Sequence, residues 1–152
     1  MSLNQLTIQS LILADDDEDD RYVFKDVINE VAPSVNVEAV ANGLRLMELL
    51  QHFAPDLLFL DLEMPYKNGL ECLLEIREQE ALNNLPTIVF SSTTRPANIQ
   101  TAYEMGAHLF LIKDSSFKEY AAALRSIFQM NWKEPDTIKE QYCVNGRYVA
   151  FN

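Results

Sequence analysis

Five side chains in this sequence are of the types that support metal-assisted phosphoryl chemistry, and they follow short apolar stretches. They are Asp15, Asp16, Asp61, Ser91 and Lys113. Mg²⁺ prefers oxygen ligands and usually takes one or two carboxylates together with phosphate oxygens. An aspartate can attack a phosphoryl group as a nucleophile, a lysine neutralises phosphoryl oxygens, and a hydroxyl donates to them. The five residue types therefore suit phosphoryl transfer to a carboxylate beside a divalent cation.

These residues meet only if the apolar stretches lie side by side. The patterning predicts strands at residues 9–14, 35–40, 56–62, 87–92 and 108–112. It predicts helices at residues 19–31, 44–53, 69–80, 96–105 and 117–130, the last capped by Ser116. This alternation predicts a flavodoxin-like α/β fold, which is a doubly wound five-stranded parallel sheet flanked by five helices. Ligands of such folds bind outside the carboxyl ends of the strands, where all five side chains would collect.

Composition and charge narrow the classes of function. The chain has 152 residues, of which 48% are hydrophobic, and a formal net charge of -11. This is the size of one domain with a real core, and the charge argues against a basic surface for nucleic acid. No apolar run approaches the roughly 18 residues of a membrane span, and residues 1–3 show no secretory signal. Two cysteines without metal or disulfide spacing favour a cytoplasmic setting.

Four motifs occur in one order and spacing: the acidic pair in LILADDD, FLDLEMPYKNG with Asp61, IVFSS with Ser91, and FLIKD with Lys113. In these motifs residues 8–130 resemble the receiver domain of two-component response regulators. The resemblance implies that Asp61 accepts a phosphoryl group from a histidine kinase or a phosphotransfer protein. It also implies a Mg²⁺ ion held by Asp16, Asp61 and the backbone carbonyl of Glu63, with Asp15 acting through a water.

The resemblance further implies a switch that binds a downstream protein target. Lys113 would pair with the phosphoryl group, and Ser91 would turn toward it. Phe110 stands at the family's aromatic switch position, and its rotation would change the face made by helix 96–105, strand 108–112 and helix 117–130. The chain is then a stand-alone regulator and not an enzyme, although it catalyses its own phosphorylation and dephosphorylation. Asp114 stands where the family usually has proline, so the geometry of the loop after Lys113 is left open.

The acidic run does not end at Asp16, because Asp17, Glu18, Asp19 and Asp20 follow it. We interpret these four residues as the acidic opening of the first helix, where the helix dipole favours negative charge. The run is thereby divided into a metal-site pair and a helix start.

Residues 131–152 extend beyond a minimal receiver domain. The segment 141–151 contains Asn145-Gly146 between strand-forming residues, which is the strongest short hairpin signal. A type I′ turn there predicts Val144 opposite Arg147 and Cys143 opposite Tyr148. An isolated hairpin is marginally stable, so it should pack on the receiver body or on a second subunit in a homodimer. A disordered tail is the alternative.

Two other functions are weighed. A haloacid-dehalogenase-like phosphatase also uses Mg²⁺, a nucleophilic aspartate, a serine and a lysine, and Asp15-x-Asp17 mimics its first motif. That family needs an acidic pair after the lysine, and beyond Lys113 only Asp114 and Glu119 are found, in poor positions. A docking module that works without phosphorylation is the other alternative, and the intact set of site residues counts against it.

Overall fold

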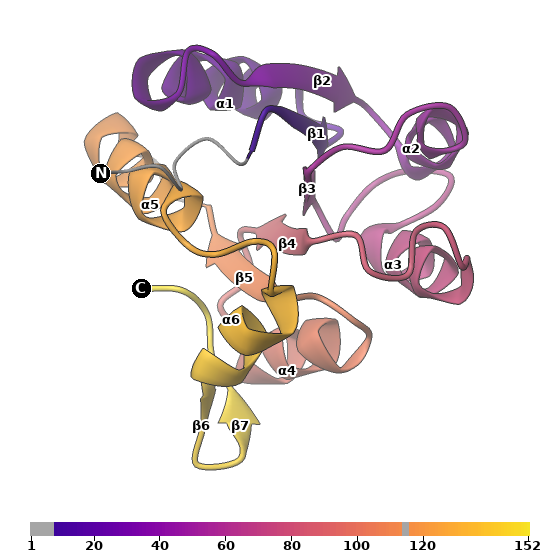
Figure 1. The fold of residues 1–152 in the computed structure, drawn as a ribbon, viewed down its shortest axis with the longest axis vertical. Helices are drawn as coiled ribbons and strands as arrows, with labels where there is room; N and C mark the ends of the chain where they lie inside the picture. Colours follow the sequence, from indigo (N-terminus) through magenta and orange to yellow (C-terminus); the bar gives the residue numbers. More distant parts are fainter. Residues whose placement is uncertain (1–7, 114–115) are drawn as a thin grey trace.

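A five-stranded parallel sheet forms the centre of the computed structural model, which describes residues 8–113 and 116–152. The strand order is β2-β1-β3-β4-β5, and every neighbouring pair is parallel. The chain moves outward from β1 to β2 and then crosses to β3 on the other side of β1 (Figure 1). This reversal beside β1 opens a crevice at the carboxyl ends of the strands. The strands are β1 (Ser10–Ala14), β2 (Asn36–Val40), β3 (Leu57–Leu60), β4 (Thr87–Ser91) and β5 (Leu109–Ile112).

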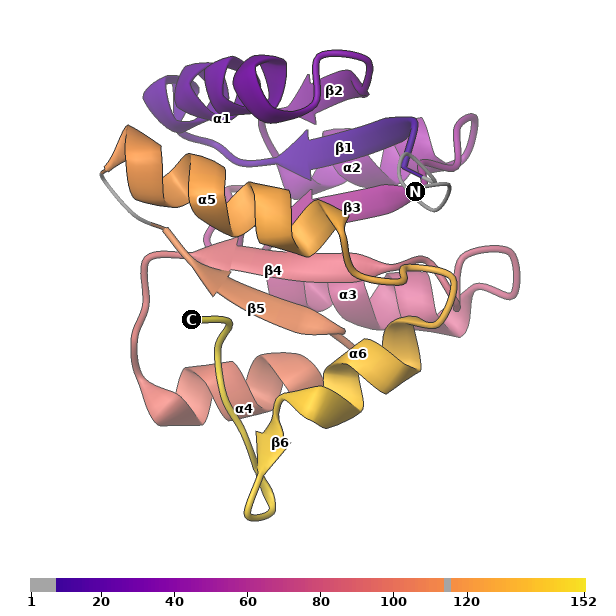
Figure 2. The same cartoon turned by 60° about the vertical axis from the view of Figure 1, so that its left-hand side comes forward.

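Two layers of helices cover the sheet. One face packs its apolar residues against α1 and α5, and the other packs against α2, α3 and α4 (Figure 2). The central strands β1, β3 and β4 are buried on both faces, which explains their continuous apolar sequences. The predicted flavodoxin-like fold is confirmed. The helices are α1 (Glu18–Val31), α2 (Gly43–Leu50), α3 (Gly69–Glu78), α4 (Pro96–Glu104) and α5 (Phe117–Phe128).

Polar side chains cap the starts of α1, α3 and α5, which follow the carboxyl edge of the sheet. The Asp17 side chain accepts from the Asp20 backbone N–H at 3.0 Å and caps α1. Asn68 and Glu71 form a reciprocal capping box at the start of α3. Ser116 caps α5, as the sequence predicts. The acidic run therefore does open a helix, and that helix begins directly beside the end of β1.

The C-terminal extension contains a short helix that the sequence did not predict, followed by the predicted hairpin. They are α6 (Pro135–Gln141), β6 (Cys143–Val144) and β7 (Arg147–Tyr148). Both predicted strand pairs of the hairpin are present. Asn145 and Gly146 have positive φ angles of 53° and 79°, as a type I′ turn requires. The extension packs on the rest of the chain, with the hairpin against α4 (Figure 1), so within residues 131–152 the disordered alternative is wrong.

None of the helices in the described part of the chain combines the length and the apolarity needed to cross a membrane.

Candidate functional site

Backbone hydrogen bonds continue past the strand ends and hold the site residues in register. The Asp15 N–H donates to the Val40 carbonyl at 3.0 Å, and the Asp61 N–H donates to the Ala14 carbonyl at 2.9 Å. The Lys113 N–H donates to the carbonyl of Ser91 at 2.8 Å. Residues from four strands are thus fixed along one edge of the sheet. The position of each side chain follows from the ladder and not from a flexible loop.

Lys113 lies at the centre of this edge and contacts three carboxylates. Its Nζ is 2.8 Å from Asp15 Oδ2, 2.8 Å from Asp20 Oδ2 and 3.2 Å from Asp61 Oδ2. Burial acts to lower the pKa of Lys113, but the bonds to Asp15 and Asp20 and the charge of Asp61 raise it above its ordinary value. The ammonium group is therefore held charged, and it is shared among more acids than it can neutralise.

Asp61 is a buried carboxylate in a crowded negative environment, with 6% of the residue exposed. Burial raises its pKa to about 6, the charge of Lys113 opposes this rise, and the charge of Asp15 adds to it. The Glu63 backbone N–H donates to Asp61 Oδ1 at 3.2 Å. At neutral pH the group is mostly ionised, poorly solvated and fixed in orientation, which are the properties of a competent nucleophile.

The carboxylates also fit a divalent cation. One oxygen from each of Asp15, Asp16 and Asp61 lies within 4.8 Å of the other two. Asp15 Oδ1 accepts from the Asp17 N–H at 3.0 Å, and the buried Oδ2 is paired with the Lys113 ammonium group, which Asp20 and Asp61 share. Three carboxylates that share one ammonium group keep uncompensated negative charge, which is costly where they are buried and which a hard cation would offset. The donor set is that of a site for Mg²⁺ or a similar ion.

Asp20 joins the site, although the sequence suggested only a role in opening the helix. Its carboxylate reaches Lys113 from the first turn of α1. The available signal was its spacing: Asp20 is one helical turn after the residues that leave β1, so its side chain returns over the strand end. The other acids of the run behave differently, because Asp17 caps the helix and Asp19 is exposed.

Ser91 is the last residue of β4 and is 1% exposed. Its Oγ accepts from the Thr93 N–H at 3.3 Å. It lies in the wall of a cleft of about 450 Å³ that also includes Glu63 and Arg95 and separates the loops that follow β3 and β4.

Phe110 is completely buried on the α4 side of the sheet, opposite Val89 of β4. Its backbone N–H donates to the Tyr103 hydroxyl at 3.0 Å. The predicted set of Asp15, Asp16, Asp61, Ser91 and Lys113 thus lies along one edge, with Phe110 three residues before Lys113 on β5. The geometry at Asp114 lies outside the described residues.

The chain is similar to known proteins over most of its length. The family model described as the response regulator receiver domain matches residues 11–125. The nitrate/nitrite response regulator protein NarL of Escherichia coli (strain K12) is 35% identical over 116 residues, which are 76% of this chain and 52% of NarL. The chain thus spans about half the length of that relative. The response regulator Rcp1 of Synechocystis is 24% identical over 135 residues, covering 84% of this chain and 91% of Rcp1.

The fold has close structural counterparts as well. The crystal structure of the phosphorylated cyanobacterial phytochrome response regulator RcpA matches with a TM-score of 0.73 and 23% sequence identity. The match covers 80% of this chain and 91% of that one.

Proposed function

Because the chain belongs to the response regulator receiver domain family, we propose that it is a stand-alone receiver phosphorylated on Asp61 by a histidine kinase or a phosphotransfer protein. The observation that carries this proposal is the buried Asp61 carboxylate beside one ammonium group and two further aspartates at the carboxyl edge of the sheet. The output is binding of a downstream protein target, and the phosphoryl transfer takes place in the cytoplasm.

Asp61 attacks the phosphorus atom of a phosphohistidine or of a small acyl phosphate. The bond between phosphorus and the donor breaks, the donor leaves with its electron pair, and an acyl phosphate forms on Asp61. Asp16, Asp61 and the backbone carbonyl of Glu63 would hold Mg²⁺, and Asp15 would support it through a water. When bound, the cation offsets the negative charge of the phosphoryl oxygens.

Lys113 takes part in the reaction by exchanging one ion-pair partner for another. Its Nζ lies nearer to Asp20, at 2.8 Å, than to Asp61, at 3.2 Å. When Asp61 carries a phosphoryl group, the ammonium group exchanges a carboxylate for a phosphoryl oxygen. Ser91 donates its hydroxyl to another of these oxygens. The movement of Ser91 makes room for Phe110 and alters the face formed by α4, β5 and α5.

One assay separates this proposal from its rivals. The full chain is incubated with acetyl phosphate and Mg²⁺, and its intact mass is measured. We expect a gain of one labile phosphoryl group, which is lost in Asp61→Asn and when EDTA removes the metal. The exposed Asp19→Asn variant is the matched control and should gain the group as the wild type does.

The other outcomes point elsewhere. Rapid turnover of many phosphomonoesters, with Asp15 essential and Asp61 dispensable, would assign the haloacid-dehalogenase-like chemistry. No mass gain with acetyl phosphate or with a phosphorylated phosphotransfer protein would leave a docking module that works without phosphorylation. The family membership and the placement of Lys113 beside Asp61 argue against both.

A further inference from the structure

The C-terminal extension lies on the face through which the proposed switch would act. We infer that residues 142–152 are the resting-state ligand of the α4–β5 face, and that phosphorylation of Asp61 releases them. This inference rests on the proposed function and adds a specific occupant for its output face. The extension has two parts with different anchoring, and they are called here the root, residues 131–141, and the tip, residues 142–152.

The root is part of the hydrophobic core. Trp132 and Ile138 are each 4% exposed and belong to the cluster that α1 and α5 form with the sheet. The Trp132 indole N–H donates to the Ile127 carbonyl at 2.8 Å. Removing such side chains from a core costs several kcal/mol. The root therefore stays in place in both states of the switch.

The tip is held by polar and aromatic contacts with α4. The Tyr148 ring stacks on the Tyr103 ring, with centroids 4.7 Å apart and planes 16° apart. The Tyr148 N–H donates to Gln100 Oε1 at 2.8 Å. Lys139 Nζ donates to the Tyr103 carbonyl at 2.8 Å and lies 5.5 Å from the Tyr148 ring centre. One tyrosine of α4 is thus the main attachment point of the tip.

The same tyrosine ties the tip to the switch residue. The Tyr103 hydroxyl accepts from the Phe110 N–H at 3.0 Å and donates to the Val149 carbonyl at 2.8 Å. The Phe110 carbonyl accepts directly from the Phe151 N–H at 2.8 Å. Both backbone polar groups of Phe110 are therefore engaged with the tip, one directly and one through a single hydroxyl.

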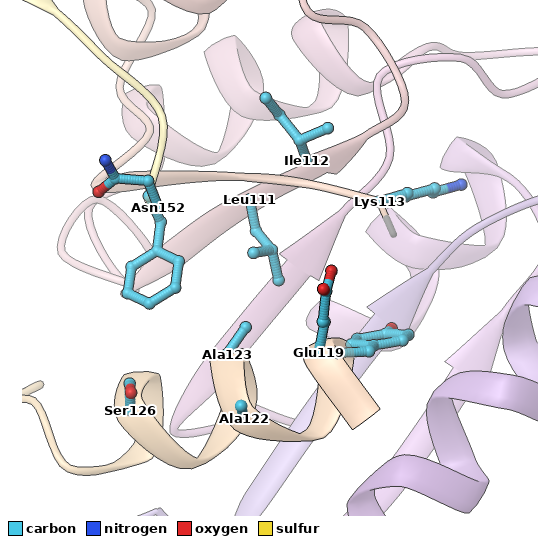
Figure 3. A pocket seen from close by; sticks show the side chains of 10 residues that line it. Leu111, Ile112, Lys113, Glu119, Ala122, Ala123, Ser126 and Asn152 are labelled. Atoms are coloured by element: carbon cyan, nitrogen blue, oxygen red, sulfur yellow. The ribbon is translucent and has the colours of Figure 1, made fainter. Parts of the chain in front are cut away.

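The tip leaves space where it meets α5. A cavity of about 440 Å³ separates Asn152 from the α5 residues Ala122, Ala123 and Ser126, with Leu111 between them (Figure 3). The hydrogen bonds and the ring stack of the tip are made with α4 and β5, and Tyr142 and Phe151 also pack against the apolar cluster that includes α5. The cavity gives this end of the chain room to move without disturbing the packing of the root.

These contacts explain why phosphorylation would loosen the tip. Hydrogen bonds weaken steeply when their angles change, and three of them depend on the positions of Phe110 and Tyr103. A hairpin with two residues in each strand has little stability of its own. Phe110 and Tyr103 belong to one buried cluster, so a rotation of the Phe110 ring would displace the Tyr103 ring and hydroxyl that hold the tip.

Thermodynamic linkage allows the inference to be tested by weakening the tip and measuring the affinity of the phosphorylation site. If a phosphoryl group weakens the tip's attachment by some factor, weakening the attachment must favour the phosphoryl group by the same factor. The probe is beryllofluoride with Mg²⁺, a stable stand-in for the phosphoryl group, titrated into the full chain by calorimetry. We expect Tyr148→Ala to bind it about fivefold more tightly than the wild type, at the lower end of usual coupling.

Two further variants sharpen the titration. Tyr103→Phe removes the bridging hydroxyl but keeps the ring stack, so it should tighten binding by a smaller factor. Val144→Ala is the matched control, because Val144 lies in the same hairpin and is 50% exposed, so it should bind like the wild type. Amide hydrogen exchange adds a direct readout: beryllofluoride should speed exchange in residues 142–152 and leave residues 135–141 unchanged.

Three results would overturn the inference. One is an affinity of Tyr148→Ala within twofold of the wild type, and another is slower exchange in the tip when beryllofluoride binds. A third is a beryllofluoride-induced dimer in which the tip remains protected, since that assigns the tip to a second copy. If the wild type binds no beryllofluoride in the presence of Mg²⁺, the proposed phosphorylation itself fails, which is a distinct result.

Discussion

Buried ionisable side chains lie at both ends of β5, but the compensation of their charges and hydrogen-bonding groups differs between the two ends. At the amino end, His108 Nδ1 accepts from the Thr87 N–H at 3.1 Å, and Arg77 donates to backbone carbonyls within hydrogen-bond distance. At the carboxyl end, three carboxylates share one ammonium group, so part of their negative charge stays uncompensated.

The groups at the amino end contribute to the stability of the fold, whereas the groups at the carboxyl end are available to a ligand. Burial, with the charges of Arg77 and Lys139, lowers the pKa of His108 to about 3, so the ring is neutral at physiological pH and Nδ1 can accept the Thr87 N–H. Burial raises the pKa of Asp61 to about 6, so that carboxylate is held ionised at neutral pH at a cost. Groups whose hydrogen bonds and charges are fully compensated stabilise the protein, whereas the carboxylates that share one ammonium group keep negative charge available for a cation or for chemistry.

The largest expected effect is at the amino end. Arg77→Met keeps the aliphatic stem but removes the bonds to the Gly106 and Leu85 carbonyls, which are 2.7–3.0 Å long. We expect unfolding in urea to show a loss of about 3 kcal/mol, because buried acceptors lose a charged partner.

The control for this change is Arg125→Met. Arg125 is exposed and lies 3.9 Å from Glu30 in a surface ion pair, so its loss should cost less than about 0.5 kcal/mol. Equal effects of the two substitutions would contradict the structural role assigned to Arg77.

The sequence predicted the carboxyl end far better than the amino end. Asp15, Asp61, Ser91 and Lys113 were found because each ends an apolar strand, and parallel strands bring their ends together. His108 received no role from the sequence, since its partners, the Thr87 N–H and Arg77, are 21 and 31 residues away. A side chain that bonds to backbone groups of another element leaves no local pattern to read.

The extension shows the same contrast. Its hairpin was predictable, because Asn145-Gly146 has the turn chemistry that a type I′ turn requires. The seven-residue α6 was not, because PDTIKEQ has one buried residue, Ile138, and hence no periodic stripe. The stack of Tyr148 on Tyr103 spans 45 positions, so only the folded chain reveals what the hairpin covers.

The second prediction tests how much the buried charge of Asp61 at the carboxyl end lowers the free energy of unfolding. In metal-free protein at pH 8, Asp61→Asn should raise the free energy of unfolding by about 2 kcal/mol, because it removes a charge that burial disfavours. Lys113 keeps Asp15 and Asp20 as partners. The expected gain is opposite in sign to the effect of Arg77→Met, so the pair tests the contrast between the two ends.

The sign of its pH dependence follows from the raised pKa. The folded state binds the Asp61 proton more tightly than the unfolded chain, whose carboxyl has a pKa near 3.8. The stability of the wild type therefore gains on the variant as pH falls through about 6 toward 4. Unfolding curves in EDTA at pH 8, 6 and 4 should show the advantage of Asp61→Asn shrinking toward zero. An advantage that stays constant over this range would contradict the raised pKa.

The smallest expected effect concerns the acidic run and compares Asp16 with Asp19. Asp16 contributes an oxygen to the three-carboxylate cluster, whereas the structure places Asp19 outside that cluster on an exposed turn of α1. Asp16→Ala should therefore weaken Mn²⁺ or Mg²⁺ binding about tenfold, which corresponds to about 1.4 kcal/mol. Asp19→Ala removes the same charge three residues further along the chain and outside the cluster, and it should change the affinity less than about twofold, because solvent and salt screen a charge that does not contact the cation. Calorimetric titration of both variants at one ionic strength provides the measurement. Equal losses would mean that the run acts through its total charge and that the cation recognises no particular carboxylate in it.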